Sequence, residues 1–286
     1  VEVVALLGLK PVLVDVDTNT FGMNIEQVKA AITPKTKAII PVHLFGQCMD
    51  IESLMKLANE HQIPVIEDNA QAIGAEYRFE DGRVKKAGTV GHIGTTSFFP
   101  AKNLGCMGDG GAIFTNDDKL NDKIRMLANH GQSSLYQFEI IGCNSRLDSL
   151  QAGILRVKLR YLDQYCDARR AAADYYDDQF NGEDSITVPF RDPKSTHVFH
   201  QYTLKVDPEK RDGLRTFLNE NGIPCGVYYP MPMHHHGAYR NTEFKDASFE
   251  VSEELCKSVI SLPMHTELTK EIQDHIIHHV KNYLQN

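Results

Sequence analysis

The sequence predicts an α/β protein with a largely parallel sheet, and two observations support this fold class. Apolar, β-branched segments at 11–16, 36–44 and 63–66 are predicted strands, and a helical segment lies between each pair. That alternation is typical of right-handed βαβ crossovers. The 286 residues, 42% of them hydrophobic, suffice for one large core and a smaller one.

Capping residues place the helices of this first half. Asn24 is a good N-cap, and Gln27 three positions later completes a capping-box pattern. Asp50 caps the next helix in the same way. The predicted helices here are 1–9, which Gly8 ends, 24–32 and 50–61.

The second half contains one long helical region at 149–180, with apolar residues near a spacing of 3.6. A helix of that length commonly connects two domains. The other predicted elements are short strands within 88–99, strands at 113–115, 201–206 and 224–229, and helices at 117–128, 211–221, 252–258 and from 269 onward. We therefore predict a large α/β domain at 1–160, a helical connection at 161–182 and a smaller α+β domain at 183–286.

Composition excludes several classes of protein. Thirty basic against 38 acidic side chains give a net charge of −8, which argues against nucleic acid or an anionic membrane as the main partner. No apolar run reaches the roughly 18–20 residues of a spanning helix, and no signal peptide is visible. The six cysteines are scattered without a C-x-x-C pair, so reduced thiols in a cytoplasmic protein are expected.

The chain opens at Val1 without a methionine, inside an apolar helical pattern (VEVVALLGLK). We expect a preceding segment that this sequence does not contain.

Polar residues follow the strand at 63–66 directly: Glu67, Asp68, Asn69 and Gln71. Ligands gather at the carboxyl ends of strands in parallel sheets, so chemistry is expected at this edge. The carboxylate of Asp68 needs a cationic or donor partner to stay ionised near a low-dielectric core. The alternative is that Asp68 caps a helix beginning at Asn69.

A glycine-rich stretch at 94–112 (GTTSFFPAKNLGCMGDGGA) contains one lysine, Lys102. Ser97 lies five residues before it, close enough for both to face one anionic ligand. The glycines at 105–111 allow close backbone approach. Each feature has a plainer alternative: a solvated lysine, a hydroxyl at a strand end and a tight turn.

Together, Asp68, Ser97 and Lys102 suggest one ligand. A pyridinium nitrogen needs a carboxylate, a phosphate needs hydroxyl and backbone donors, and an aldehyde needs a lysine; pyridoxal 5′-phosphate has all three groups. A dinucleotide site is less well supported, because Gly88, Gly91 and Gly94 do not have the G-x-G-x-x-G spacing.

The run His234–His236 could suggest a metal site. Adjacent histidines point in different directions, and no acidic or cysteine partner lies at metal-site spacing, so we expect no metal. The histidines of the last helix, at 275, 278 and 279, are expected to form a solvated face.

Several motifs resemble the sugar aminotransferases of the DegT/DnrJ/EryC1/StrS family. The specific ones are EDNAQAIGA (67–75), GTTSFFPAKNLGCMGDGGAIFTND (94–117), HGQ (130–132) and CNSRLDSLQAGIL (143–155), and weaker ones are QYTL (201–204), YYPMPMH (228–234) and SLPMH (261–265). The resemblance covers essentially the whole chain. It implies the fold-type-I aminotransferase architecture, with a three-layer αβα large domain, a mainly parallel sheet and a smaller α+β C-terminal domain. It also implies a homodimer with shared active sites.

The resemblance assigns roles residue by residue. Lys102 matches the lysine that holds pyridoxal phosphate, Asp68 the carboxylate on the ring nitrogen, and Gln71 the side chain beside the ring hydroxyl. Ser97 matches a phosphate-binding hydroxyl, and Asn144 an asparagine that reaches the phosphate from the neighbouring subunit.

The resemblance also indicates where substrate binds. Arg146 would meet an anionic substrate group, a surface or interface ion pair being the alternative, and it would suit a uronic acid. Tyr229 and His234, in the matching Y-P-x-P-x-H turn, are expected to border the substrate pocket. The family's phosphate-binding Gly-Thr or Gly-Ser turn would precede Val1.

Three functions remain open. A lysine at 102, where dehydratase relatives carry histidine, favours transamination from glutamate to a nucleotide-linked keto sugar, for amino-sugar or polysaccharide biosynthesis. Phe99 stands where members acting at C4 tend to have histidine, so C3 is the expected position and C4 the alternative. The third function is a non-catalytic cofactor-binding sensor or structural module.

Overall fold

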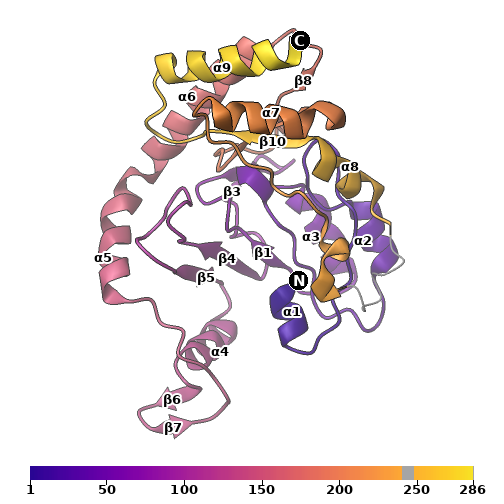
Figure 1. The fold of residues 1–286 in the computed structure, drawn as a ribbon. Helices are drawn as coiled ribbons and strands as arrows, with labels where there is room; N and C mark the ends of the chain where they lie inside the picture. Colours follow the sequence, from indigo (N-terminus) through magenta and orange to yellow (C-terminus); the bar gives the residue numbers. More distant parts are fainter. Residues whose placement is uncertain (240–247, 286) are drawn as a thin grey trace. The chain divides into compact units, whose positions relative to one another are not determined.

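The computed structural model describes residues 1–239 and 248–285 (Figure 1). Contacts divide the chain into two compact units. Unit 1 consists of Val1–Thr36, Ala171–Arg191 and Gln201–Asn286, and unit 2 of Lys37–Arg170 and Asp192–His200. Each unit is described by itself.

The sheet of unit 2 has the order β1-β4-β5, where β1 is Ile66–Asp68, β4 is Ile93–Ser97 and β5 is Gly111–Phe114. β1 and β4 are parallel, and β5 is antiparallel to β4. The predicted strand at 36–44 pairs with the β1 segment only through two parallel bridges, Ile39 to Val65 and Val42 to Asp68. The parallel pairing is confirmed, and β5 overlaps the strand predicted at 113–115. Its antiparallel direction was not predicted; it arises because the glycine-rich loop turns the chain back beside β4.

Two capped helices of unit 2 agree with the prediction within one residue. α3 (Ile51–Glu60) begins after Asp50, whose side chain accepts a hydrogen bond from Ser53 N at 3.2 Å. α4 (Asp118–Ala128) begins after Asp117, which accepts from Leu120 N at 2.9 Å. Each cap satisfies an amide that the helix itself leaves without a partner.

Two hairpins of unit 2 were not predicted. β2 (Glu76–Arg78) pairs with β3 (Val84–Lys86), and β6 (Gln132–Ser134) pairs with β7 (Gln137–Phe138), both antiparallel. Their strands are two or three residues long and mostly polar, so they lack the apolar alternation that marks a strand in a sequence. Figure 1 shows the β6–β7 hairpin beyond α4.

The predicted helical region at 149–180 is confirmed. It consists of α5 (Ser149–Lys158), a 3₁₀ turn η2 (Leu159–Tyr161) and α6 (Leu162–Phe180). The other short 3₁₀ turns are η1 (Leu44–Gly46), η3 (Met233–His235) and η4 (Gly237–Tyr239). Within the described ranges, no helix is long and apolar enough to cross a membrane.

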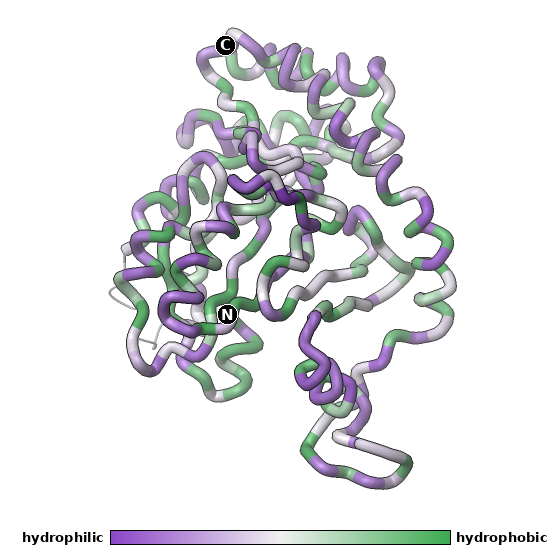
Figure 2. The backbone as a smooth tube through the Cα atoms, turned by 180° about the vertical axis from the view of Figure 1, so that it is seen from behind, coloured by the Kyte–Doolittle hydropathy of each residue, from purple (hydrophilic) through white to green (hydrophobic). Residues whose placement is uncertain are grey.

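Unit 1 has an α+β arrangement. Its antiparallel sheet has the order β10-β9-β8, with β8 at Ile186–Thr187, β9 at Tyr202–Val206 and β10 at Val259–Leu262. Its later helices are α7 (Pro208–Glu220), α8 (Glu250–Ser258) and α9 (Lys270–Gln285). Hydrophilic and hydrophobic stretches alternate along α9 in Figure 2, and its buried face includes Ile276, Ile277, Val280 and Leu284.

The predicted capping box at α2 (Ile25–Ala31) forms only in part. Asn24 Oδ1 accepts from Gln27 N at 3.1 Å, as expected. The side chain of Gln27 does not return to the amide of Asn24; its Oε1 accepts from Asp15 N at 2.7 Å. The predicted strands at 11–16 and 224–229 are wrong, because each makes a single isolated bridge, Val16 to Met23 and Gly226 to Ser261.

Asp15 joins the first residues of the chain to the start of α8. Its carboxylate accepts hydrogen bonds from Val251 N and Ser252 N, both at 2.9 Å, and from Ser252 Oγ at 2.6 Å. Burial alone raises the pKa of Asp15, but these donors lower it further than burial raises it. Val1–Thr36, which includes the short helix α1 (Glu2–Leu6), is grouped by its contacts in the same unit as the C-terminal residues. The domain prediction placed this segment in the large domain at 1–160. The boundaries at 160 and 183 stay a prediction.

Candidate active site

Asp68 is the last residue of β1 and its backbone is fixed on both sides. Asp68 N donates to Pro41 O at 2.8 Å, Asp68 O accepts from His43 N at 3.0 Å, and Asp68 is in register with Thr95 of β4. Its Oδ1 accepts from Ala70 N at 3.0 Å. The carboxylate caps a turn and not a helix, because the next element after Asp68 is β2. Oδ2 is left for another partner.

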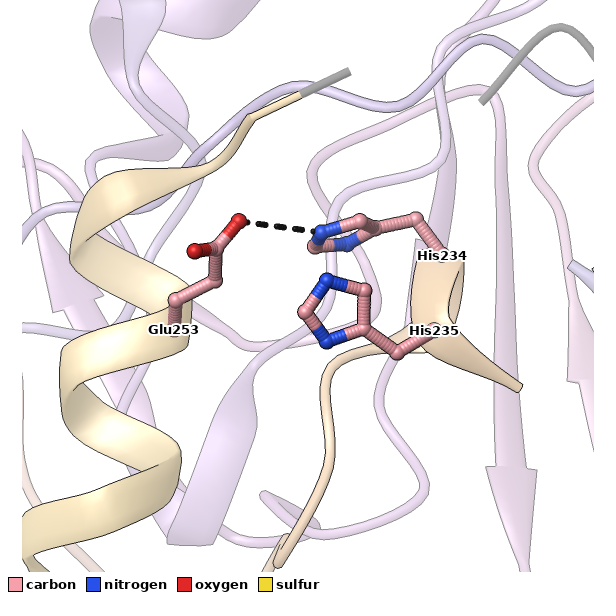
Figure 3. Close-up of side chains that lie close together, drawn as sticks. All are labelled: His234, His235 and Glu253. Atoms are coloured by element: carbon pink, nitrogen blue, oxygen red, sulfur yellow. Dashed lines mark hydrogen bonds and ion pairs between the residues drawn. The ribbon is translucent and has the colours of Figure 1, made fainter. Parts of the chain in front are cut away.

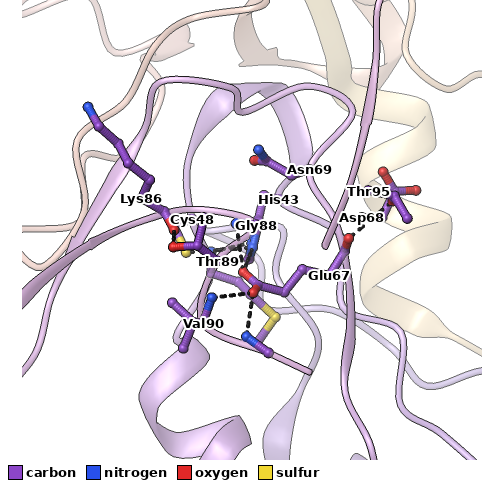
Figure 4. A network of polar contacts seen from close by, with 12 residues as sticks. His43, Cys48, Glu67, Asp68, Asn69, Lys86, Gly88, Thr89, Val90 and Thr95 are labelled. Atoms are coloured by element: carbon purple, nitrogen blue, oxygen red, sulfur yellow. Dashed lines mark hydrogen bonds and ion pairs between the residues drawn. The ribbon is translucent and has the colours of Figure 1, made fainter. Parts of the chain in front are cut away.

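Glu67, one residue before, is fully buried and closed to further partners (Figure 4). Its Oε2 accepts from His43 Nε2 and from Gly88 N, both at 2.8 Å, and its Oε1 accepts from Val90 N at 2.7 Å and from Gly91 N. Met49 N donates to His43 Nδ1 at 3.4 Å, so Nε2 carries the proton. Burial raises the pKa of Glu67, but the hydrogen bonds outweigh it and the pKa is lowered. Glu67 therefore fixes the loop at 88–91 beside β1.

Gln71 holds the turn that follows β1. Its Oε1 accepts from Phe45 N at 2.6 Å, and Phe45, in η1, has a positive φ of 57°. A non-glycine residue in this backbone region needs support from its surroundings, which this bond supplies. The amide nitrogen of Gln71 remains as a donor.

Ser97 ends β4, and a closed loop leads from it to the lysine. Ser97 Oγ accepts from Phe99 N at 3.2 Å, Lys102 N donates to Phe99 O at 2.9 Å, and Cys106 N donates to Phe98 O at 2.8 Å. Gly105 permits the close approach of the loop to itself, because a Cβ there would lie 2.4 Å from Pro100 O. Ser97 and Lys102 are thus held at the two ends of one turn.

Lys102 is half-buried, and its Nζ makes no hydrogen bond or ion pair within the described residues. Burial lowers the pKa of this amine, and the charge of Asp68 opposes the lowering. The neutral amine, which is the nucleophilic form, is favoured relative to an exposed lysine. The two residues singled out from the sequence are therefore close enough to act on each other.

His200 belongs to the same site and was missed in the sequence. Its Nδ1 is buried without a hydrogen-bond partner, and its pKa is lowered to about 3, first by burial and then by the charges of Lys102 and Arg169. Arg169 donates to Phe199 O at 2.9 Å and Asn103 Nδ2 donates to Val198 O at 2.8 Å, which holds this segment against the lysine loop. His200 therefore presents a neutral ring near Lys102.

Asn144 and Arg146 lie on the exposed stretch 143–150. Asn144 forms an isolated bridge with Asn129, and Arg146 donates to Asn129 Oδ1 at 3.2 Å. In the part of the chain that the structure describes, neither forms an ion pair, and neither is bonded to Asp68, Ser97 or Lys102. The fold brings Asp68, Ser97 and Lys102 together and leaves these two at the surface.

Tyr229 and His234 belong to unit 1. Tyr229 is exposed and its ring contacts that of Tyr228 edge-on, with centroids 5.9 Å apart. His234 is buried, and its Nε2 lies 3.1 Å from Glu253 Oε1.

The residues of unit 2 fit pyridoxal phosphate. Within the described residues, Asp68 offers a carboxylate oxygen without a hydrogen-bond partner and Lys102 an amine without one, and Ser97 offers a hydroxyl at the end of a strand. The glycines that follow leave no space for a Cβ at Gly105 or Gly111, where it would meet backbone oxygens at 2.4 and 2.7 Å. These are the donors that a pyridinium nitrogen, an aldehyde and a phosphate require.

Comparison with known proteins agrees with this chemistry. The model of the DegT/DnrJ/EryC1/StrS aminotransferase family matches residues 1–281. The chain is 43% identical to a UDP-2-acetamido-2-deoxy-3-oxo-D-glucuronate aminotransferase of Pseudomonas aeruginosa, over 93% of this chain and 71% of that protein. It is also 43% identical to a UDP-N-acetyl-3-dehydro-alpha-D-glucosamine 3-aminotransferase of Acidithiobacillus ferrooxidans, over 94% of this chain and 70% of that protein. A "Pleiotropic regulatory protein" of Geobacillus stearothermophilus is likewise 43% identical, over 99% of this chain and 75% of its own length.

The fold is shared with solved structures of the same family. A DegT DnrJ EryC1 StrS aminotransferase from Brucella abortus superposes with a TM-score of 0.92 at 38% identity, over 100% of this chain and 76% of that chain. The predicted fold class, enzyme class and cofactor are confirmed. The chain belongs to the DegT/DnrJ/EryC1/StrS aminotransferase family, whose members depend on pyridoxal 5′-phosphate.

Proposed function

We propose that the protein transfers an amino group from glutamate to the C3 keto group of a nucleotide-linked sugar. The observation that carries this proposal is the pair Lys102 and Asp68. The lysine amine is half-buried, its Nζ makes no hydrogen bond within the described residues, and the carboxylate is close enough to influence its pKa. Such a pair suits a cofactor that needs one covalent anchor and one acidic partner.

The residues of unit 2 would hold the cofactor as follows. Ser97 Oγ and the amides of the glycine-rich loop would bind the phosphate, Asp68 Oδ2 would bind the ring nitrogen, and Gln71 Nε2 would bind the ring hydroxyl. Asn144 reaches the phosphate of a second copy. Pyridoxal phosphate supplies an aldehyde that carries the amino group and a ring that takes up electrons.

Lys102 moves the protons. Its Nζ accepts the proton from the α-carbon of the donor as a general base and returns one as a general acid. Burial favours the neutral form needed for the first role. Asp68 holds a proton at the ring nitrogen, and β1 keeps this carboxylate in place through the two backbone bonds of Asp68.

Two relatives support C3 as the site of amination. Both the Pseudomonas and the Acidithiobacillus protein are named for 3-keto sugars linked to UDP. Phe99, which is 51% exposed in the loop between Ser97 and Lys102, agrees with the C3 group of the family. We propose a UDP-linked sugar on this basis, with C4 as the alternative position.

Arg146, Tyr229 and His234 are proposed to contact the substrate. Arg146 is exposed and its guanidinium has one side-chain partner, Asn129, so it can meet an anionic group. A uronic acid carboxylate at C5 would be such a group. One relative is named for a glucuronate and the other for a glucosamine, and we propose Arg146 as the residue that distinguishes these two sugars.

We also propose a homodimer with shared active sites. The large side chains Leu135, Tyr136, Phe138 and Ile141, on and beside the β6–β7 hairpin, are all exposed. Large exposed apolar side chains gathered in one short segment favour an interaction site. This segment directly precedes Asn144, which supports a contact between copies that carries Asn144 to the second active site.

The cellular setting is a further proposal. The six cysteines are free, which suits a reducing cytoplasm. The product, an amino sugar on a nucleotide, would enter amino-sugar or polysaccharide biosynthesis.

A regulatory protein without turnover is the second candidate, because one relative is named a pleiotropic regulatory protein. Lys102 and Asp68 are both present, which favours catalysis over a sensor.

One experiment separates these functions. The full-length protein is loaded with pyridoxal phosphate, and its visible absorption is followed as glutamate is added. Loss of the band, followed by its return with a 3-keto nucleotide sugar and an amino sugar in the mass spectrum, supports the proposal. The Lys102→Ala variant should lack the lysine-bound band, and the Lys119→Ala variant, changed at an exposed lysine of α4, should keep it. A band that glutamate does not change would favour the sensor, and activity on 4-keto sugars alone would move the reaction to C4.

A further inference from the structure

His234, His235 and Glu253 bring three metal-ligating atoms together in unit 1. One ring nitrogen of each histidine and one carboxylate oxygen lie within 4.8 Å of one another (Figure 3). The histidines belong to η3 and the glutamate to α8, 18 and 19 positions later in the sequence. The acidic partner that the sequence lacked at metal-site spacing is supplied by the fold.

The two rings are not arranged as consecutive side chains usually are. Neighbours in a 3₁₀ turn diverge by about 120°, since the turn has 3.0 residues. Here the ring centroids of His234 and His235 are 4.1 Å apart, and Figure 3 shows both rings on the side of the Glu253 carboxylate. The hydrogen bond between His234 and Glu253 explains why these two side chains lie close together. It does not explain why the ring of His235 lies beside them.

The distances suit one ion. His234 Nε2 and Glu253 Oε1 are 3.1 Å apart. Two ligands at 2.0–2.2 Å from a tetrahedral ion are separated by roughly 3.4 Å, so small rotations of these side chains would seat it. Two imidazoles and one carboxylate are a donor set that zinc uses, with a fourth position left to water.

The surroundings hold two of the ligands. Phe249 N donates to Glu253 Oε1 at 3.2 Å, and the Phe249 ring meets His234 edge-on with centroids 4.9 Å apart. The amide of Phe249, followed by His234 and His235, lowers the pKa of Glu253. Among the described residues, His234 is buried and His235 is exposed to solvent.

We propose that His234, His235 and Glu253 bind one divalent transition-metal ion of the zinc class. Imidazole nitrogens exclude calcium and magnesium as preferred occupants, and Co²⁺, Ni²⁺ and Cu²⁺ are competitors by ligand type. His234 is also a proposed substrate contact, but zinc binding can be measured without the proposed aminotransferase activity. It replaces our expectation that this histidine run holds no metal.

The test uses the untagged full-length chain, stripped with a chelator and dialysed. Zn²⁺ is titrated by calorimetry, and Co²⁺ is titrated by visible absorption, which reports the coordination geometry. We expect one ion per chain in both titrations. His235→Ala should weaken zinc binding by about 10–100-fold or more, since even partners of the ligands affect affinity on this scale. Because His235 is exposed, its replacement should leave the fold intact, which circular dichroism checks.

His236→Ala is the matched control, because His236 adjoins the cluster in sequence and is not part of it. It should bind zinc as the parent chain does, whereas Glu253→Gln should bind more weakly. The proposal is overturned if the parent chain binds no zinc, if His235→Ala binds it as tightly as the parent, or if His236→Ala loses binding to the same extent.

Discussion

Asp68 and Lys102 interact across the candidate site, because the carboxylate of Asp68 raises the pKa of the Lys102 amine against the larger lowering caused by burial. Residues 34 positions apart in the sequence are thereby coupled. Single substitutions can test this coupling.

Asp68→Asn should lower the pKa of Lys102 further, because it removes the charge that favours the ammonium form. The measurement is the pH dependence of labelling of Lys102 by a small amine-reactive reagent in cofactor-free protein, read by mass spectrometry. Its midpoint should move to lower pH. Asp118→Asn, at an exposed carboxylate of α4, should leave it unchanged. A midpoint that stays or rises in Asp68→Asn would show that the two groups are not coupled.

The same Asp68→Asn variant should lose activity. Buried electrostatic partners of a reacting group are worth about 3–4 kcal/mol or more, which is about 10²–10³-fold or more in rate. The loss should fall mainly on kcat, since the carboxylate acts on the cofactor and not on the sugar. Kinetics with glutamate at saturating cofactor check this. A loss confined to KM, with kcat unchanged, contradicts the role proposed for Asp68.

His200 should destabilise the protein in acid. Its pKa is about 3 in the folded chain against an ordinary 6.5, so the unfolded chain binds more protons between these values. Stability is therefore fully present above about pH 6.5 and is lost as the pH falls toward 3. The side chain is partly exposed, and we expect about 1–2 kcal/mol between pH 7 and pH 5.

Urea unfolding at several pH values measures this contribution. His200→Gln should flatten the loss of stability between pH 7 and pH 5, and His61→Gln, at an exposed histidine, should not. An unchanged pH profile in His200→Gln would mean that the pKa of the ring is the same in the folded and the unfolded chain.

Arg146→Ala should discriminate between sugars. If the guanidinium meets a uronic acid carboxylate, its loss removes a charge-assisted hydrogen bond worth about 1.5–3 kcal/mol, which is about 10–100-fold in kcat/KM. The measurement compares UDP-linked 3-keto sugars with and without the C5 carboxylate. Only the acidic sugar should be affected, and Arg156→Ala on the exposed face of α5 should affect neither. Equal losses on both sugars rule out carboxylate recognition.

The exposed hairpin surface should be needed for dimerisation. Tyr136 and Ile141 are 80% and 96% exposed, and changing both to glutamate would place charges in the proposed contact. Light scattering after gel filtration should then report a monomer, and cofactor affinity should fall because Asn144 no longer reaches a second copy. Ile272→Glu, at an exposed apolar position of α9, is the control and should stay dimeric. A dimer that survives the double change places the interface elsewhere.

Local signals were enough to place the capped helices and to predict three candidate cofactor-binding residues. Asn24 and Asp50 cap their helices through bonds to residues three positions away, so their effect is visible in any short window of sequence. Lys102, Asp68 and Ser97 were predicted from the sequence because one cofactor requires all three groups. The turn at 97–106 also depends mainly on its own residues.

The features that were not predicted depend on contacts between residues far apart in the sequence. The side chain of Gln27 bonds to Asp15 and not to its own helix start, which only the folded chain reveals. His200 is 98 positions after Lys102, and its defining property, a buried Nδ1 without a partner, is created by packing. Packing also brings Glu253 to hydrogen-bonding distance of His234.

The adjacent carboxylates of β1, Glu67 and Asp68, have different roles. Glu67 accepts hydrogen bonds from His43 and from three loop amides, so its removal would leave two buried donors unpaired, at about 1–3 kcal/mol each, and two part-buried amides at a smaller cost. Asp68 keeps one oxygen open. A design that grafts this site onto another scaffold would therefore have to include Glu67, His43 and the loop at 88–91. Asp68 is the proposed cofactor partner, and its position depends on the hydrogen bonds of its neighbour Glu67.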